Sequence, residues 1–131
     1  MVKTVLIYAF RGEEEEKLKK LASGKGVRLI DVPRDRYGEK IADLVAGRPS
    51  PGRTGGGEES FPERMMVFAG FEEEEFDLFL KSLREEKIGS GALKAILTPV
   101  NAGWTSRELF RELGKEREAF FRMRGAGKPG V

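Results

Sequence analysis

Residues 4–10 read Thr-Val-Leu-Ile-Tyr-Ala-Phe and are followed by Arg11-Gly12 and by four glutamates at positions 13–16. A run rich in β-branched and aromatic residues predicts a buried strand. Glycine indicates a turn, and glutamates favour the first turn of a helix because they offset its positive end. Apolar residues at helical spacing come next. The stretch therefore predicts strand, turn and helix, the opening unit of an α/β fold.

The rest of the chain extends this plan. The patterns predict a strand at 27–32, a helix at 37–46, a strand at 65–69, a helix beginning near 72, a strand at 93–97 and a helix beginning near 105. The order strand-helix-strand-helix thus occurs twice. The repetition fits an internal repeat from an ancient duplication, and it fits equally well the reuse of one common unit.

The charge pattern of the strands predicts their order in the sheet. Residues 5–10 and 65–69 are apolar throughout, as expected of central strands buried on both faces. Arg28, Asp31 and Lys94 interrupt the other two strands, which suits edges. We expect a three-layer α/β/α sandwich with a four-stranded parallel sheet of order 2-1-3-4. Right-handed crossovers would then place the first and last helices on one face and the other two on the opposite face.

Length and glycine content indicate the domain organisation. At 131 residues the chain fits one domain, which we expect at 1–121. A glycine- and proline-rich stretch at about 47–60 predicts a flexible internal loop, and 122–131 predicts a disordered basic tail. The internal loop superficially resembles a phosphate-binding loop but lacks the Gly-Lys-Ser/Thr ending.

Composition excludes several classes of function. The chain has no cysteine and no histidine, so disulfides, thiol nucleophiles and imidazole bases are absent. A formal net charge of +2 gives no general attraction to nucleic acid or membranes. The N-terminus lacks the features of a signal peptide, so we expect a cytoplasmic protein. We also expect no cofactor, and a small molecule or a protein as partner.

The predicted parallel sheet locates a candidate ligand site. With order 2-1-3-4, a crevice would open between the carboxyl ends of the first and third strands. The candidate ligand-binding residues on this rim are Arg11, Gly12, Gly70, Thr98, Asn101 and Trp104. Glycines would allow close backbone approach, the polar side chains would supply hydrogen bonds, and the indole would supply a flat apolar wall.

Each of these features also has a structural interpretation. Thr105 and Glu108 have the spacing of a capping box, and Trp104 can pack against Leu109 to hold the loop on the following helix. Asn101 can bond to its own backbone. The glutamate runs stabilise helix ends better than they would form a cation site.

Several stretches of the second half carry a family resemblance. These are Val67-Phe68-Ala69-Gly70-Phe71, Leu93-Lys94-Ala95-Ile96-Leu97-Thr98-Pro99, Asn101 with Trp104-Thr105, and Glu108-Leu109. Over residues 64–120 the chain resembles an uncharacterised bacterial family, domain of unknown function 3783. The resemblance implies a small bacterial cytoplasmic protein and no catalytic residue.

Three functions remain open. The first is a non-catalytic ligand-binding or protein-interaction domain with a regulatory role, because no nucleophile and base occur together. The second is a small Mg²⁺-dependent or nucleotide-handling enzyme that uses Arg11, Thr98, Asn101 and Glu13 or Glu72. The third is an RNA-associated protein, whose basic residues would be Arg34, Arg36, Arg122, Arg124 and Lys128.

Overall fold

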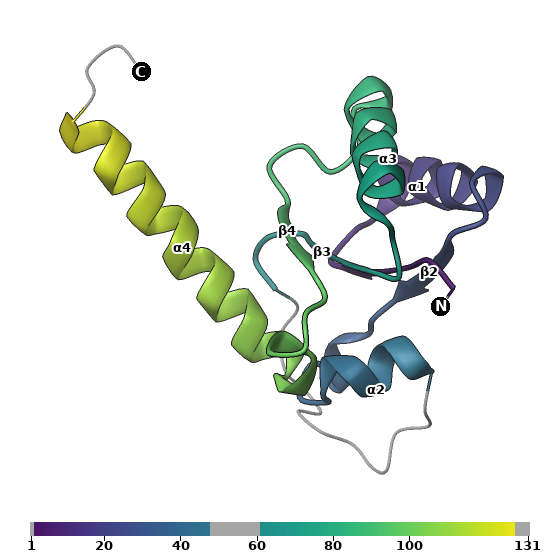
Figure 1. Cartoon of the computed structure of the whole chain (residues 1–131), viewed down its shortest axis with the longest axis horizontal. Coiled ribbons are helices and arrows are strands. Elements are labelled where there is room, and N and C mark those ends of the chain that lie inside the picture. Colours follow the sequence, from purple (N-terminus) through teal and green to yellow (C-terminus); the bar gives the residue numbers. More distant parts are fainter. Residues whose placement is uncertain (1, 48–60, 128–131) are drawn as a thin grey trace.

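The computed structural model of the chain describes residues 2–47 and 61–127, with side chains as far as residue 117. Its centre is a four-stranded sheet of order β2-β1-β3-β4 (Figure 1). The strands are β1 (Thr4–Tyr8), β2 (Arg28–Asp31), β3 (Met65–Ala69) and β4 (Leu93–Ile96). The predicted order is confirmed, with the two uniformly apolar strands in the middle. Most of the predicted internal loop, 48–60, lies outside the described residues.

The sheet is mixed, so the prediction of a purely parallel sheet is wrong. β1 pairs with β2 in parallel, and β3 pairs with β4 in parallel. The two central strands are antiparallel, with Thr4 opposite Ala69 and Tyr8 opposite Met65. A strand buried on both faces has the same continuous apolar pattern in either direction. The sequence pattern therefore reports that a strand is central without reporting which way it runs.

Strand direction also decides which face each helix covers. α1 (Gly12–Gly24) and α3 (Glu73–Glu86) pack on one face, while α2 (Ile41–Ala46) and the start of α4 (Ser106–Gly127) pack on the other. This differs from the expected pairing of the first and last helices. Each parallel pair has its crossover helix on the right-handed side. Because β3 is reversed and its partner lies in the opposite lateral direction, α3 comes to the same face as α1.

Alternating strand residues fill two apolar cores. Leu6 and Tyr8 point into the core beneath α2 and α4, whereas Val5 and Ile7 point into the core beneath α1 and α3. In the first core the rings of Tyr37 and Phe61 stack with centroids 4.0 Å apart. The Tyr8 hydroxyl shares a 2.6 Å hydrogen bond with Ser106 Oγ, and burial raises the pKa of Tyr8. This buried bond joins β1 to the first turn of α4.

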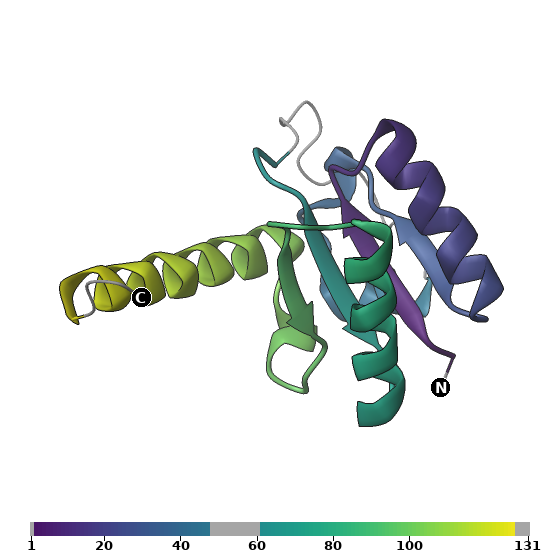
Figure 2. The same cartoon turned by 90° about the horizontal axis from the view of Figure 1, so that it is seen from above.

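α4 is longer than the predicted last helix and leaves the body of the domain. It continues to Gly127, so residues 122–127, which we expected in a disordered tail, are helical; residues 128–131 lie outside the described part. Figure 2 shows α4 extending past β4, on the side away from β2. Glycines at 125 and 127 suggested a break, but the residues before them are mostly good helix formers. In residues 2–47 and 61–127, no helix has the length and apolar character needed to span a lipid bilayer.

Both central strands turn into their helices through a residue with positive φ. In the first half this residue is Ala9, with φ 65°, and in the second half it is Gly70, with φ 81°. Each directly follows the last residue of its strand. Only glycine adopts this left-handed conformation without a steric cost. The turn therefore stores strain in the first half that the second half avoids.

We predict that Ala9→Gly stabilises the domain. Removing Cβ relieves the left-handed strain, and the gain exceeds the entropy that glycine adds to the unfolded chain, leaving about 0.5–1 kcal/mol. Gly70→Ala should destabilise the domain by a similar or larger amount. Urea unfolding of both variants measures the two changes. A lower unfolding free energy for Ala9→Gly would contradict the strain argument.

Candidate functional site

The predicted site residues lie at opposite ends of the strands of the sheet. Arg11 and Gly12 follow β1, whereas Gly70 follows β3 and Thr98 follows β4, with Asn101 and Trp104 further along. Since β1 and β3 are antiparallel, their carboxyl ends lie at opposite ends of the sheet along the strand direction. The prediction that these residues share one crevice is therefore wrong. In the structure they form two separate groups.

Asn101 and Thr98 bind each other and the end of β4. The Thr98 N–H donates to Asn101 Oδ1 at 2.9 Å, and the Asn101 N–H donates to Thr98 Oγ1 at 3.1 Å. Asn101 Nδ2 also donates to the Ile96 carbonyl at 3.0 Å. The Asn101 residue is 8% exposed. These bonds use the polar groups that we expected to meet a ligand, which favours the structural interpretation of this loop.

The capping box before α4 is confirmed. The Thr105 N–H donates to Glu108 Oε1 at 2.8 Å, and the Glu108 N–H donates to Thr105 Oγ1 at 3.1 Å. The half-buried Trp104 packs against the core cluster that contains Leu109. Its carbonyl accepts a 2.9 Å hydrogen bond from the Ile41 N–H. Trp104 thus ties the loop to both α2 and α4.

Arg11 borders a polar hollow of about 370 Å³ at the carboxyl ends of β1 and β2. Glu15, Asp31 and Arg34 also line it. Burial raises the pKa of Asp31, a hydrogen bond and the negative charge of Glu15 raise it further, and the charges of Lys19 and Arg11 act against these effects. The hollow thus combines two arginines with two carboxyl groups, and its charges largely offset one another.

The glutamate runs stabilise the starts of α1 and α3. The Glu72 N–H donates to Glu75 Oε1 at 3.0 Å, and Lys3 Nζ lies 3.2 Å from Glu75 Oε2. The backbone bond and the lysine lower the pKa of Glu75. On α1, Glu16 pairs with Lys19 at 3.6 Å. No group of three or more metal-ligating side chains forms a cation site in the part of the chain that the structure describes.

A larger pocket lies between the end of α3 and β4, where the sequence predicted none. Its volume is about 700 Å³. It is lined by Leu80, Leu83, Arg84, Lys87, Ile88, Gly89, Ser90 and Lys94. Its floor is apolar and its rim carries three cations. The helical pattern assigned the leucines to the core, and Lys94 served only to identify an edge strand, so no pattern in the sequence indicated that they share a pocket.

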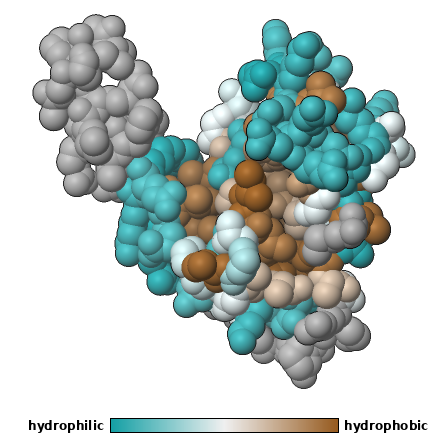
Figure 3. All heavy atoms as spheres, in the orientation of Figure 1, coloured by the Kyte–Doolittle hydropathy of each residue, from teal (hydrophilic) through white to brown (hydrophobic). Residues whose placement is uncertain are grey.

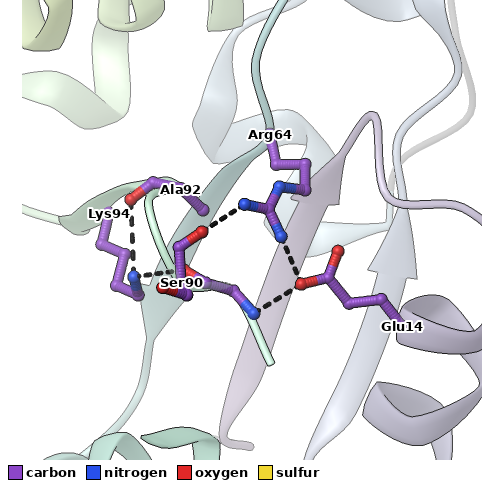
Figure 4. Close-up of polar contacts among 6 residues, drawn as sticks. Glu14, Arg64, Ser90, Ala92 and Lys94 are labelled. Carbon is purple, nitrogen blue, oxygen red and sulfur yellow. Dashed lines mark hydrogen bonds and ion pairs between the residues drawn. The ribbon is translucent and has the colours of Figure 1, made fainter. Parts of the chain in front are cut away.

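A polar clamp holds the loop that forms one wall of this pocket (Figure 4). Glu14 of α1 forms an ion pair with Arg64, and its Oε2 accepts a 2.7 Å hydrogen bond from the Gly89 N–H. Arg64 also donates to the Ser90 carbonyl, and its guanidinium lies 5.6 Å from the Phe10 ring centroid. We call Glu14 and Arg64 the Glu14–Arg64 clamp. The clamp therefore holds the loop at two successive residues, through the Gly89 N–H and the Ser90 carbonyl.

The cations of the rim differ in how they are held. Lys94 Nζ donates to the Gly89 carbonyl at 2.8 Å. Burial lowers the pKa of Lys94, the charge of Arg64 lowers it further, and Glu14 opposes both effects. Arg84 and Lys87 are exposed and form no ion pair with any described residue. An acidic group at this rim would meet cations whose charge is not already neutralised.

Comparison with known families gives one match. Residues 64–120 match the model of the family described as Domain of unknown function (DUF3783). The matched segment contains β3, α3, β4 and the greater part of α4, and with them the whole pocket lining, but it does not include Glu14 of the clamp. Comparisons with curated proteins and with solved structures give no significant match.

We predict that Glu14→Ala lowers the free energy of unfolding by about 1–3 kcal/mol, because the Gly89 N–H and Arg64 both lose their acceptor. Glu14→Gln should cost less, since its amide oxygen can still accept from Gly89. The matched control is Glu16→Ala, at an exposed position of the same helix, with an expected change within about 0.5 kcal/mol. Equal losses in urea unfolding for Glu14→Ala and Glu16→Ala would contradict a role for the clamp.

We predict that Asp31→Asn raises stability at pH 7. The raised pKa means that the folded state holds a proton on Asp31 more tightly than the unfolded state does. The contribution of Asp31 to stability is therefore greatest at low pH and is lost as the pH rises through the folded-state pKa. The advantage of Asp31→Asn should shrink as the pH falls through the folded-state pKa of Asp31, and it should be absent below the unfolded-state pKa of about 4. Thermal unfolding from pH 3 to 8 tests this, with exposed Asp77→Asn as control, and a pH-independent difference would contradict it.

Proposed function

We propose that the protein is a non-catalytic ligand-binding domain, and that its ligand is a small molecule with an acidic group on an apolar body. The observation that carries the proposal is the pocket between α3 and β4, whose apolar floor meets a rim of three cations. Ligand pockets are mostly apolar, with a few polar groups that orient the ligand. The volume of about 700 Å³ lies in their usual range.

The floor supplies the apolar part of the interaction. Leu80, which is half-buried, and the buried residues Leu83 and Ile88 all line the pocket, so its base is apolar. Apolar surface removed from water contributes about 25 cal/mol per Å². A short hydrocarbon body therefore gains from entering the pocket even before any charged contact forms.

The rim supplies the charged part. Arg84 and Lys87 stand at the carboxyl end of α3, where cations also offset the negative end of the helix. Glu85 and Glu86 stand in the same turn and balance these two charges overall, but Arg84 and Lys87 line the pocket and the two glutamates do not. Lys94 comes from β4 and adds a third cation to the lining. This local placement favours an anionic group in the ligand.

The positions of the other candidate residues support a binding role over catalysis. The alternative enzyme would use Arg11, Thr98, Asn101 and either Glu13 or Glu72. Arg11 and Glu13 follow β1, whereas Glu72 follows β3 and Thr98 and Asn101 follow β4, at the opposite end of the strands. The two groups are therefore separated by about the length of a five-residue strand, roughly 17 Å. The absence of histidine and cysteine further restricts the available acid–base chemistry.

Three further proposals concern the origin, the layering and the cellular setting of the domain. We propose that the two strand-helix-strand-helix halves descend from a duplication, which their repeated element order supports. We propose that the helices on the two faces complete a three-layer sandwich, which the two separate cores support. We also propose a bacterial, cytoplasmic setting, which the family resemblance over residues 64–120 supports.

We predict that the chain binds decanoate and that decanol binds at least about tenfold more weakly, a difference of 1.4 kcal/mol. Both probes have the same hydrocarbon body, so the difference isolates the acidic group. Calorimetric titration below the micelle concentration measures both affinities. Equal affinities for the two probes, or no binding of decanoate, would overturn the proposal.

Charge reversal on α3 locates the site. The double variant Arg84→Glu with Lys87→Glu should lose decanoate binding by at least about tenfold. Both positions are exposed, so the fold should tolerate the change. Lys81→Glu is the matched control, because Lys81 is an exposed lysine of the same helix outside the pocket. An equal loss for Lys81→Glu would show general electrostatic attraction and would reject the pocket.

A further inference from the structure

The free edge of β4 presents backbone groups that the domain itself does not pair. The Leu93 N–H donates to the Arg64 carbonyl at 3.0 Å, and the Leu97 N–H donates to the Phe68 carbonyl at 2.8 Å. Alternate residues of a strand direct their backbone groups to opposite sides, so Lys94 and Ile96 direct theirs outward. Their N–H groups and the Lys94 carbonyl have no partner among the described residues.

Exposed apolar surface accompanies this edge. Ile96 is 53% exposed although it lies within a strand. Figure 3 shows hydrophobic surface beside α4, in the region where Figure 1 places β4. Edge strands are usually protected by charge, proline or a covering element. β4 contains one lysine and no proline, so half of its backbone edge lacks these forms of protection and can pair with another strand.

α4 extends over the space beside this edge. Its last described side-chain contact with the body is at Arg117, which pairs with Glu63 and donates to the Gly91 carbonyl at 3.3 Å. Beyond it, residues 118–127 continue past β4 and away from the sheet (Figures 1 and 2). That segment is about 15 Å long and includes Phe120 and Phe121 in its sequence. A helix end of this length gains little stability without packing.

We propose that two copies of the chain associate through antiparallel pairing of β4 with β4, and that the projecting end of α4 packs on the sheet of the second copy. The two four-stranded sheets then form one continuous sheet of eight strands. This interface shares Lys94 with the rim of the pocket proposed above, but its backbone pairing does not require a ligand there.

The backbone and the charges select one register. With Ala95 on the two-fold axis, Lys94 lies opposite Ile96 of the second copy, and each such pair exchanges two backbone hydrogen bonds. A shift that places Lys94 opposite Lys94 opposes like charges. A shift that places Ile96 opposite Ile96 aligns Lys94 with Thr98, whose N–H already donates to Asn101. The Ala95 register uses the N–H groups of Lys94 and Ile96 and the Lys94 carbonyl, and it avoids the like-charge pair. It also needs the Ile96 carbonyl, which already accepts from Asn101 Nδ2 but has a second lone pair, whereas the Thr98 N–H has only one proton to donate.

We assign the partner as a second copy of the chain because the β4 edge can pair with an identical edge and the end of α4 can pack on an identical sheet. A two-fold axis through Ala95 continues each sheet into the region toward which α4 extends in Figure 2. Each projecting helix end then has a sheet beneath it, on the face already covered by the start of α4. The same symmetry supplies both copies with identical contacts, as in most homodimers.

Two substitutions at one exposed position test the interface and its register. Ile96→Lys places a second cation opposite Lys94 and should convert a dimer to a monomer. Ile96→Glu places an anion opposite Lys94 and should leave the dimer intact. Sedimentation equilibrium of the full chain at several concentrations measures the association state. A monomeric wild-type chain, or equal association of the two variants, would overturn the proposal.

A single cysteine provides a second measurement. The chain contains no cysteine, so Ala95→Cys can form a disulfide only with the second copy. Residues directly opposite at a non-hydrogen-bonded position lie about 4.5 Å apart between Cα atoms, within the range of a disulfide. Lys94→Cys is the control, because its nearest copy lies about 7–8 Å away on the diagonal. Equal or absent cross-linking of the two variants under mild oxidation would reject this register.

Discussion

The arrangement of the domain depends on the pairing of β1 with β3 in opposite directions. Five pairs of residues, from Thr4 with Ala69 to Tyr8 with Met65, form this central contact, and all ten are buried. Once these strands are antiparallel, the handedness of each crossover determines the face of every helix. The same pairing separates the loops after β1 from those after β3. The position of the clamp follows from it, because the start of α1 then lies beside the loop after α3.

Sequence patterns predicted the elements and their order because those properties depend on local periodicity and on charge. The uniformly apolar strands are central, the interrupted strands are edges, and the capping box at Thr105 and Glu108 forms as its spacing requires. Strand direction was not predictable, since an apolar run satisfies both of its neighbours in either direction. The error in direction then carried over to the helix faces and to the shared crevice.

The pocket was missed for a different reason. Its lining comes from the end of α3, the loop at Gly89 and Ser90, and Lys94 of β4, and each part has an ordinary local explanation. The Glu14–Arg64 clamp joins residues 50 positions apart, and the bond from Gly89 to Glu14 spans 75. Glu14 was one of four similar glutamates in the sequence. Only the fold distinguishes Glu14, which reaches the loop, from Glu15, which lines the hollow beside Asp31, and from the exposed Glu13 and Glu16.

The antiparallel centre also determines the electric field of the domain. α1 and α3 contact each other on one face and follow strands of opposite direction, so their peptide dipoles oppose one another. In a fully parallel sheet the amino ends of all such helices converge on one edge, where their N–H groups create a ready site for phosphate. Here the positive end of one helix lies near the negative end of its neighbour, and the long-range potential largely cancels. Recognition of a charged molecule must therefore come from individual side chains acting at short range, and because Arg84 and Lys87 of the pocket rim are exposed, added salt should weaken it.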